Sequence, residues 1–345
     1  MGRYIARRLL QAIPMLFILS VLLFTLVNVA PGDPVAAMTG RRPRPQVRER
    51  IVRQLGLDQP LPVQYLYWLA GNDWVRIDTD GDGIAESRGE RRGILRGDFG
   101  FSYRTREPAI DEILDRLGNT AYLMAITLIV VFIVAIPVGI ISAIKQYSFF
   151  DIGATTLSFM GQAIPEFWLG MLLNIVFYTL LSNPFSGEPL LPPGGMKTLG
   201  ADFSIADRAK HLILPVTMGA VGWVAWYSRF LRAGMLDVIH QDYIRTARAK
   251  GFSERAVMLR HALKNAMIPL ITIFALDIPV IFAGSLYVEL IFSWPGMGRL
   301  YYQAATGRDY PLLMAILVIG SAFTVLANLV ADIGYGFLDP RVRYS

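Results

Sequence analysis

Six long apolar segments constrain the fold of this 345-residue chain more than any other feature of its sequence. A helix of about 20 apolar residues covers the hydrocarbon core of a bilayer, and each segment is long enough to do so. Because 54% of the residues are hydrophobic and only 17% are charged, an ordinary soluble domain is excluded. We predict an all-α polytopic membrane protein with six transmembrane helices, at Leu9–Ala30, Gly118–Ile144, Ile152–Leu181, Leu212–Phe230, Ile268–Phe292 and Leu312–Phe337.

The first apolar segment has a rival interpretation as a secretory signal peptide. The apolar core of a signal peptide is about 7–15 residues long and is followed by a small-residue cleavage site. Leu9–Ala30 is longer than that and is followed by Pro31-Gly32-Asp33-Pro34. The sequence therefore favours an uncleaved first transmembrane helix.

Lys and Arg are unevenly distributed between the two sides of the predicted bundle. About fourteen lie in the ends and short connections of one side and about five on the other, and the richer side is the cytoplasmic one. Both termini are therefore predicted to be cytoplasmic. The predicted division is 1–30 for the N-terminus and first helix, 31–117 for a small extracytoplasmic domain, and 118–345 for a five-helix core with a cytoplasmic loop at 231–267.

Two carboxylates lie well inside predicted membrane helices. Glu166 follows Pro165 in the third segment, and Asp277 precedes Pro279 in the fifth. A charged side chain at this depth is costly and marks either a polar path or a partner on a neighbouring helix. Both interpretations stay open for both residues, a translocation path and a hydrogen bond between helices.

The segment from Arg229 to Pro269 carries eight basic residues between two apolar segments. It could simply set the membrane orientation. Its pattern, however, predicts a helix over Asp242–Lys250 that stops at Gly251, and a second helix capped by Ser253 that runs to about Leu263. Ala247, Ala249 and Gly251 would give the first helix a small surface suited to docking in a groove of a soluble partner.

Several functions are excluded by what the sequence lacks. It has no Gly-x-x-x-x-Gly-Lys-Ser/Thr loop, so the chain is not expected to bind ATP by itself. Its three histidines are not spaced as metal ligands or as a base beside a nucleophile, and there are no cysteines. The formal charge of +6 comes from basic residues beside apolar segments, which favours the lipid bilayer and acidic partners over nucleic acid. We therefore expect no enzyme activity from this chain.

An acidic stretch in the predicted outer domain has the spacing of a calcium loop. Carboxylates stand at positions 1, 3 and 5 with glycine at position 6, and the twelfth position is Gly89 instead of a bidentate Glu. An acidic, glycine-rich turn without metal is the alternative. The candidate calcium ligands are the side chains of Asp78, Asp80, Asp82 and Glu86 and the carbonyl of Ile84.

Motifs along nearly the whole chain resemble those of ABC-importer permeases of the dipeptide/oligopeptide/nickel family. The cytoplasmic part is Thr246-Ala247-Arg248-Ala249-Lys250-Gly251, followed by His261-Ala262-Leu263-Lys264-Asn265. The other matching motifs, in order, are Arg7-Arg8-Leu9, Pro31-Gly32-Asp33-Pro34, Gly97-Asp98-Phe99-Gly100, Pro165-Glu166-Phe167, Leu191-Pro192-Pro193-Gly194-Gly195, Glu289 through Gly298, Asp309-Tyr310-Pro311 and Leu338-Asp339-Pro340-Arg341. The entry motif and the long first outer domain are similar to the B-type subunit.

This resemblance implies one half of an ATP-driven permease in the plasma (inner) membrane of a prokaryote. The implied partners are a second permease of the C type, two ATP-binding subunits and an extracytoplasmic substrate-binding protein. The residues implied to couple to the ATPases are Arg245, Thr246, Ala247, Ala249, Lys250 and Gly251. No cofactor is required by the resemblance. Peptides are the favoured cargo, although nickel chelates, glutathione and sugars use similar permeases.

The chain departs from the family pattern in two places. The general importer loop begins Glu-Ala-Ala, whereas Arg245, Thr246 and Ala247 stand here, so a contact made by that Glu does not carry over. The stretch 74–92 looks like an insertion, so its calcium loop has no support from the family. A rival function is an ion-gradient-driven carrier or channel, which would need paired intramembrane charges or discontinuous repeats.

Overall fold

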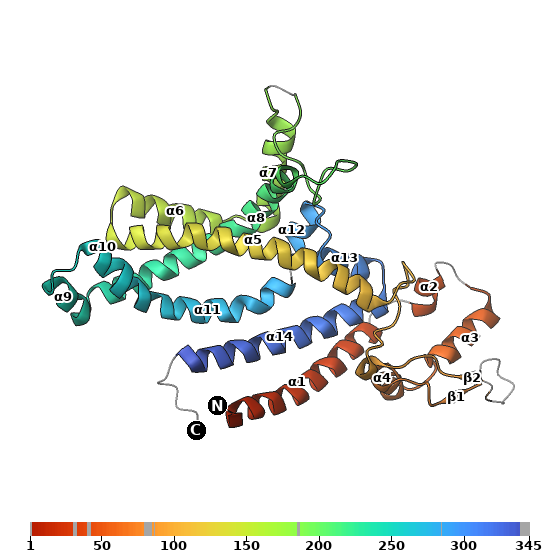
Figure 1. Cartoon of the computed structure of the whole chain (residues 1–345). Helices are drawn as coiled ribbons and strands as arrows, with labels where there is room; N and C mark the ends of the chain where they lie inside the picture. Colours follow the sequence, from red (N-terminus) through yellow and green to blue (C-terminus); the bar gives the residue numbers. More distant parts are fainter. Residues whose placement is uncertain are drawn as a thin grey trace. The chain divides into compact units, whose positions relative to one another are not determined.

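The computed structural model describes residues 2–29, 33–39, 43–78, 85, 87–184, 187–283 and 285–338, and the chain is mostly helical (Figure 1). It divides into two compact units. The first is mainly Met1–Leu117 together with Leu300–Leu329, and the second is mainly Gly118–Arg299. Each unit is described in turn.

The first unit is built on α1 and the beginning of α14. It contains α1 (Gly2–Val29), α2 (Pro34–Thr39), α3 (Pro45–Leu55), α4 (Leu61–Ala70), β1 (Arg76–Ile77), β2 (Ser87–Arg88), η1 (Ile94–Arg96), the start of α5 (Ala109–Ile144), the end of α13 (Met297–Thr306) and the start of α14 (Tyr310–Leu338). Phe24, Tyr65 and Met314 pack together, so α1, α4 and α14 lie side by side. The Phe24 and Tyr65 rings meet edge to face, 5.5 Å between centroids.

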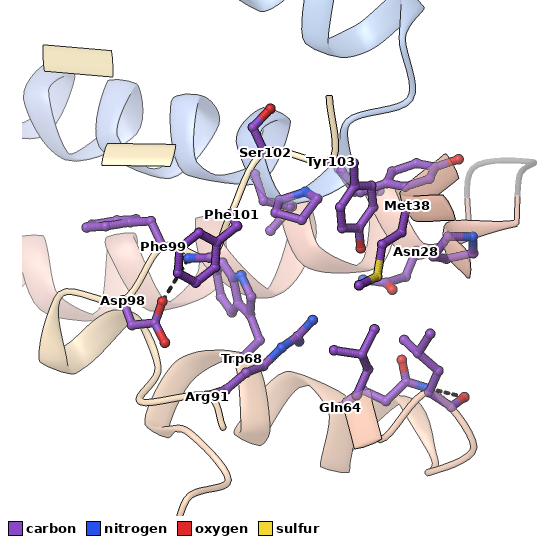
Figure 2. A pocket seen from close by; sticks show the side chains of 18 of the residues that line it. Asn28, Met38, Gln64, Trp68, Arg91, Asp98, Phe99, Phe101, Ser102 and Tyr103 are labelled. Atoms are coloured by element: carbon purple, nitrogen blue, oxygen red, sulfur yellow. Dashed lines mark hydrogen bonds between the residues drawn. The ribbon is translucent and has the colours of Figure 1, made fainter. Parts of the chain in front are cut away.

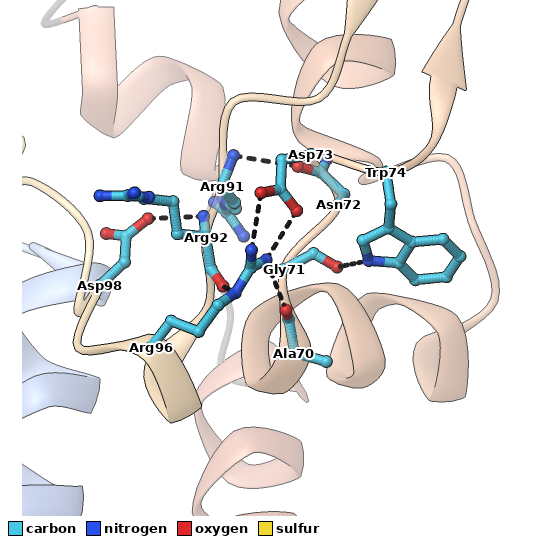
Figure 3. Close-up of polar contacts among 9 residues, drawn as sticks. All are labelled: Ala70, Gly71, Asn72, Asp73, Trp74, Arg91, Arg92, Arg96 and Asp98. Atoms are coloured by element: carbon cyan, nitrogen blue, oxygen red, sulfur yellow. Dashed lines mark hydrogen bonds and ion pairs between the residues drawn. The ribbon is translucent and has the colours of Figure 1, made fainter.

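Two close-approach glycines set the path of the chain after α4, and the first of them, Gly71, is drawn in Figure 3. A Cβ atom on Gly71 would lie 2.5 Å from the Arg92 carbonyl oxygen, and one on Gly93 would lie 2.3 Å from the Gly71 nitrogen. Arg96 links the segment around Gly93 to the segment around Gly71, because its guanidinium donates to both carboxylate oxygens of Asp73 and to the Ala70 carbonyl. The hydrogen bond from Arg96 holds the pKa of the Asp73 carboxyl below its ordinary value.

The second unit is a bundle in which α8 is the central helix. It contains most of α5, then α6 (Phe149–Ala163), α7 (Glu166–Asn174), η2 (Ile175–Leu180), α8 (Ile205–Ile239), α9 (Asp242–Ala249), α10 (Glu254–Ala256), η3 (Val257–Ala262), α11 (Leu263–Ala283) and α12 (Leu286–Ile291). Helix α8 packs against α6, α7, α11 and α12. An apolar cluster that includes Leu214, Met218, Phe292 and Trp294 forms one core of this unit.

Among the described residues, three helices are long and apolar enough to cross a membrane, at Ile5–Val29, Ala109–Ile144 and Tyr310–Val330. A fourth would be the pair Phe149–Ala163 and Glu166–Leu180, which is bent by 99°. The prediction of several membrane-spanning helices is therefore confirmed, but the number six is not. The 212–230 stretch lies within α8 but contains Gly, Pro, Tyr and Trp and is less apolar. The predicted span Ile268–Phe292 is divided, because α11 ends at Ala283 and α12 begins at Leu286.

Candidate functional site

The basic segment folds as the sequence predicts, into two helices separated by a glycine. Helix α9 ends at Ala249, and Gly251 has φ +81°, a conformation that side chains other than glycine rarely adopt. The Ser253 side chain then accepts a hydrogen bond from the Ala256 amide and begins α10. The second helix does not stop near Leu263 but continues through η3 into α11.

Helix α9 is attached to the bundle by two side chains on one face. Ile244 is fully buried and Ala247 is 5% exposed, and they pack with Met235 of α8 and with Val257 and Ala262 of η3. The interpretation of Ala247 as part of an exposed docking surface is therefore wrong. The signal was present in the sequence, because Ile244 is three residues before Ala247 and helical residues at that spacing share a face.

The opposite face of α9 is exposed and carries Arg245, Thr246 and Ala249, and the remaining predicted coupling residues, Lys250 and Gly251, follow directly after the helix and are also exposed. The Arg245 side chain is 83% exposed and lies 3.7 Å from Asp242. At the end of the helix Arg248 pairs with Glu254 at 2.8 Å, across the Gly251 turn. This hydrogen bond from Arg248 holds the pKa of the Glu254 carboxyl below its ordinary value.

Two arginines assigned to the basic segment belong instead to α8 and face α6. Arg232 makes a two-pronged ion pair with Asp151, at 2.6 and 2.7 Å. Arg229 lies over the Phe159 ring, 4.5 Å from its centroid, and donates to the side chain of Gln162. They therefore join two helices of the bundle and are not part of the surface around α9.

Glu166 lies at a break in the third predicted helix. Pro165 has no amide hydrogen to continue the ladder of α6, so the chain turns there and Glu166 becomes the first residue of α7. Its carboxylate accepts a hydrogen bond from Ser285 at 3.1 Å. It lines a cavity of about 650 Å³ whose other wall includes Trp223 and Trp226 of α8.

Asp277 is tied to a neighbouring helix. Tyr227 of α8 donates its hydroxyl hydrogen to the Asp277 carboxylate at 2.6 Å. Tyr227 is fully buried, with its ring beside those of Trp223 and Phe132. The two carboxylates singled out in the sequence thus differ, because Asp277 has a tyrosine partner across the helix interface and Glu166 lines a cavity.

A third carboxylate, at the start of the motif 289–298, is the most buried one among the residues that the structure describes. Glu289 is fully buried and accepts hydrogen bonds from Thr120 Oγ1 at 2.8 Å and from the Arg299 amide at 3.0 Å. A Cβ atom on Gly296 would lie 2.5 Å from its carboxyl group. The signal for this burial in the sequence was the pair of glycines at 296 and 298. Because they lack side chains, the loop can fold back onto the Glu289 carboxylate.

Of the candidate calcium ligands, Asp80, Asp82, Ile84 and Glu86 lie outside the described residues. Asp78, its first position, follows strand β1. No group of three or more His, Cys, Asp or Glu suited to a metal ion occurs in the part of the chain that the structure describes.

Comparison with known proteins gives a consistent result. Residues 135–344 match a family model described as the binding-protein-dependent transport system inner membrane component, and residues 1–124 match the N-terminal model of the same kind of protein. The oligopeptide transport system permease protein AppB of Bacillus subtilis is 42% identical, over 100% of both chains. The glutathione transport system permease protein GsiC of Escherichia coli is 38% identical, also over 100% of both chains.

A solved structure also shares the fold. A chain from an inward-facing form of the MetNI methionine ABC transporter matches 67% of this chain and 97% of its own length, with a TM-score of 0.51 and 14% sequence identity. At this identity the likeness shows the fold alone.

Proposed function

This chain belongs to the family of binding-protein-dependent transport system inner membrane components, and on that premise we propose that it forms one half of the translocation path of an ATP-driven peptide importer. Such a protein is a multi-pass inner-membrane permease subunit. Its relatives are named as permeases of oligopeptide and glutathione transport systems, which favours short peptides and similar small solutes as cargo. The ion-gradient carrier is not favoured by these relatives.

The observation that carries the proposal is the two-sided character of α9. One side is held in the apolar core by Ile244 and Ala247, while Arg245, Thr246 and Ala249 are exposed on the other. A soluble subunit that docks on the exposed side can therefore move α8 and the start of α11 through packed contacts. The proposed docking residues are Arg245, Thr246, Ala249, Lys250 and Gly251. Ala247 is proposed to act indirectly, because its buried side chain packs α9 against the bundle.

Coupling also requires that docking differ between the inward-open and outward-open states. A partner that binds two states with equal affinity does not change their populations. A change of the population ratio from 1:99 to 99:1 needs about 5.5 kcal/mol of differential binding. The rigid connection of α9 to the core gives closure of the ATPases a mechanical route to such a difference.

We assign the cavity at Glu166 to the translocation path. A carboxylate in a cavity that tryptophan rings also line suits an ammonium group, because the charge and the ring faces both attract cations. The N-terminal amine of a peptide has this chemistry, and Glu166 with Trp223 and Trp226 provides the matching groups. Asp277 is proposed to contribute to the same path through its link to Tyr227.

The partners proposed for this chain are a second permease, taken to be a different C-type chain, two ATP-binding subunits and an extracytoplasmic binding protein. Residues 1–30 would supply the cytoplasmic N-terminus and first helix, 31–117 the outer domain, and 118–345 the permease core with its coupling loop. ATP hydrolysis would then occur on the partner subunits.

Calcium binding at residues 78–86 is a separate proposal that rests on the sequence alone. Calorimetric titration of the purified chain with Ca²⁺ and with Mg²⁺ tests it. We expect Ca²⁺ to bind selectively and Asp80→Asn with Asp82→Asn to abolish that binding. Equal binding of both ions, or unchanged binding in the double variant, would rule out the loop.

The docking surface is tested by site-directed crosslinking, for which a chain without cysteine is convenient. Cysteine is placed at Ala249, on the exposed face, or at Ala247, on the buried face, and a cysteine-to-lysine reagent is added to the complete complex. We expect Ala249→Cys to crosslink to an ATP-binding subunit and Ala247→Cys to crosslink far less. Failure of Ala249→Cys to crosslink in an assembled complex would reject this surface.

A further inference from the structure

The first unit contains a pocket of about 300 Å³ that the transport function does not use (Figure 2). Its walls are mostly apolar and aromatic and come from α1, α4, the start of α14 and the loop that follows η1. Phe24, Trp68, Phe99, Tyr103 and Met314 are among the lining residues. A pocket of this kind suits the apolar part of a ligand.

One charged group in this pocket has no partner among the described residues. Arg91 is half-buried, its side chain points into the pocket, and no hydrogen bond or ion pair of its guanidinium occurs within the described chain. Its backbone, by contrast, is held by Asn72. A half-buried guanidinium is costly to leave unpaired, and it binds phosphate and carboxylate groups well.

Several other polar groups at the pocket have partners, among them Glu90, which accepts a hydrogen bond from Gln54. Both oxygens of the Asp98 carboxylate accept backbone amide hydrogens, from Arg92 and Gly100. Gln64 donates to two backbone carbonyls, and Arg106 donates to the Met38 carbonyl. Arg91 is therefore the lining group most open to an anionic ligand.

The position of the pocket along the membrane helices indicates the source of that ligand. Phe24 and Asn28 lie in the last part of the candidate span Ile5–Val29, and Tyr310 and Met314 lie at the beginning of Tyr310–Val330. The ends of membrane-spanning helices lie at the depth of lipid headgroups, where aromatic and basic side chains gather. On α1 itself Leu22, Leu26 and Val29 are exposed and offer an apolar surface to acyl chains.

We propose that this pocket binds one phospholipid of the surrounding leaflet, with its phosphate on the Arg91 guanidinium and the start of an acyl chain among the aromatic residues. The lipid would fasten the outer domain of the first unit to its two membrane helices. It is independent of the docking surface on α9 and of the cargo.

The experiment is a lipid titration of the purified complete complex by native mass spectrometry. The probe is dihexanoyl phosphatidylglycerol, and dihexanoylglycerol, which lacks the phosphate, is the chemical control. Arg91→Gln is compared with Arg92→Gln, because Arg92 is adjacent, carries the same charge and does not line the pocket. We expect Arg91→Gln to weaken binding about tenfold, Arg92→Gln to leave it near wild type, and Arg91→Lys to restore part of it.

Three outcomes would overturn the proposal. Equal loss in Arg91→Gln and Arg92→Gln would show an unspecific charge effect. Inorganic phosphate that binds as tightly as the lipid would make the pocket an anion site without a place for an acyl chain. Unchanged lipid binding in Arg91→Gln, combined with weaker retention of the soluble binding protein, would make it a protein docking site. A thermal melt of each variant distinguishes these outcomes from misfolding.

Discussion

Thr120 donates a 2.8 Å hydrogen bond to the buried carboxylate of Glu289, although the two residues are 169 positions apart in the chain. The same hydroxyl oxygen accepts the amide hydrogen of Met297, also at 2.8 Å. One side chain of α5 thus bonds both α12 and the first residue of α13. Nearby, the Asn119 side chain donates to the Pro295 carbonyl, and the Trp294 indole donates to the Asn119 carbonyl.

We predict that Thr120→Val destabilises the second unit, because it leaves a buried carboxylate oxygen and a buried amide with one partner fewer. The expected loss is about 2 kcal/mol, since each unsatisfied buried group costs about 1–3 kcal/mol. Thermal denaturation in detergent measures it. Thr324→Val is the matched control, because Thr324 is exposed and bonds only its own helix. A melting temperature lowered equally in both variants would contradict this role of Thr120.

Gly296→Ala is predicted to destabilise the protein because its Cβ would lie 2.5 Å from the Glu289 carboxyl group. Overpacking of this kind costs about 1–3 kcal/mol. Gly118→Ala is the control, since a Cβ there meets nothing within 4 Å and the residue lies inside α5. Alanine is the better helix former, so this control should be neutral or slightly stabilising. If Gly296→Ala melts no lower than Gly118→Ala, the close packing of this loop on Glu289 is refuted.

The Arg232–Asp151 pair is predicted to be strongly coupled, since the Asp151 side chain is only 3% exposed. Arg232→Met would leave a buried carboxylate without its cation and cost about 3–5 kcal/mol. Asp151→Asn in the same chain should recover part of that loss. A double-mutant cycle on the unfolding free energy measures the coupling, and additive effects would show that the pair does not join α6 to α8.

The Arg248–Glu254 pair is predicted to make the stability of this turn depend on pH. Because the pKa of the folded Glu254 carboxyl is lowered, the pair stabilises the turn fully above the ordinary pKa of 4.5 and loses this effect as pH falls through the lower folded value. Both side chains are largely exposed, so the effect is small, at most about 1 kcal/mol. A carbon-13 NMR titration of Glu254 should give a midpoint below 4.5 that rises in Arg248→Gln. An unmoved midpoint would show that Arg248 is not the cause.

The parts of the fold that depend on local signals were predictable from the sequence. The stop at Gly251 and the cap at Ser253 are set by residues within a few positions of one another. The membrane helices α1 and α5 were likewise evident from their length and apolar character.

Long-range pairing was not predictable, because one sequence carries no information on which distant side chains meet. The Arg232–Asp151 pair joins positions 81 residues apart, and Thr120 reaches Glu289 across a still larger separation. The bend at Pro165 was visible as a proline, but its angle depends on how α6 and α7 pack on α8. Ala247 was assigned to the surface because it is small, although its spacing from Ile244 indicated burial.

The central claim is that the exposed face of α9 connects this permease to separate ATP-binding subunits. The most direct test is ATP-driven uptake of a labelled oligopeptide by proteoliposomes that contain the complete importer, with wild type, Ala249→Ser or Ala249→Glu in this chain. Ala249 is exposed, so neither substitution disturbs the core. We predict uptake that requires ATP and the ATP-binding subunits, near-normal uptake with Ala249→Ser, and at least about a tenfold loss with Ala249→Glu. Normal uptake with Ala249→Glu, or uptake by this chain without the ATP-binding subunits, would contradict the claim.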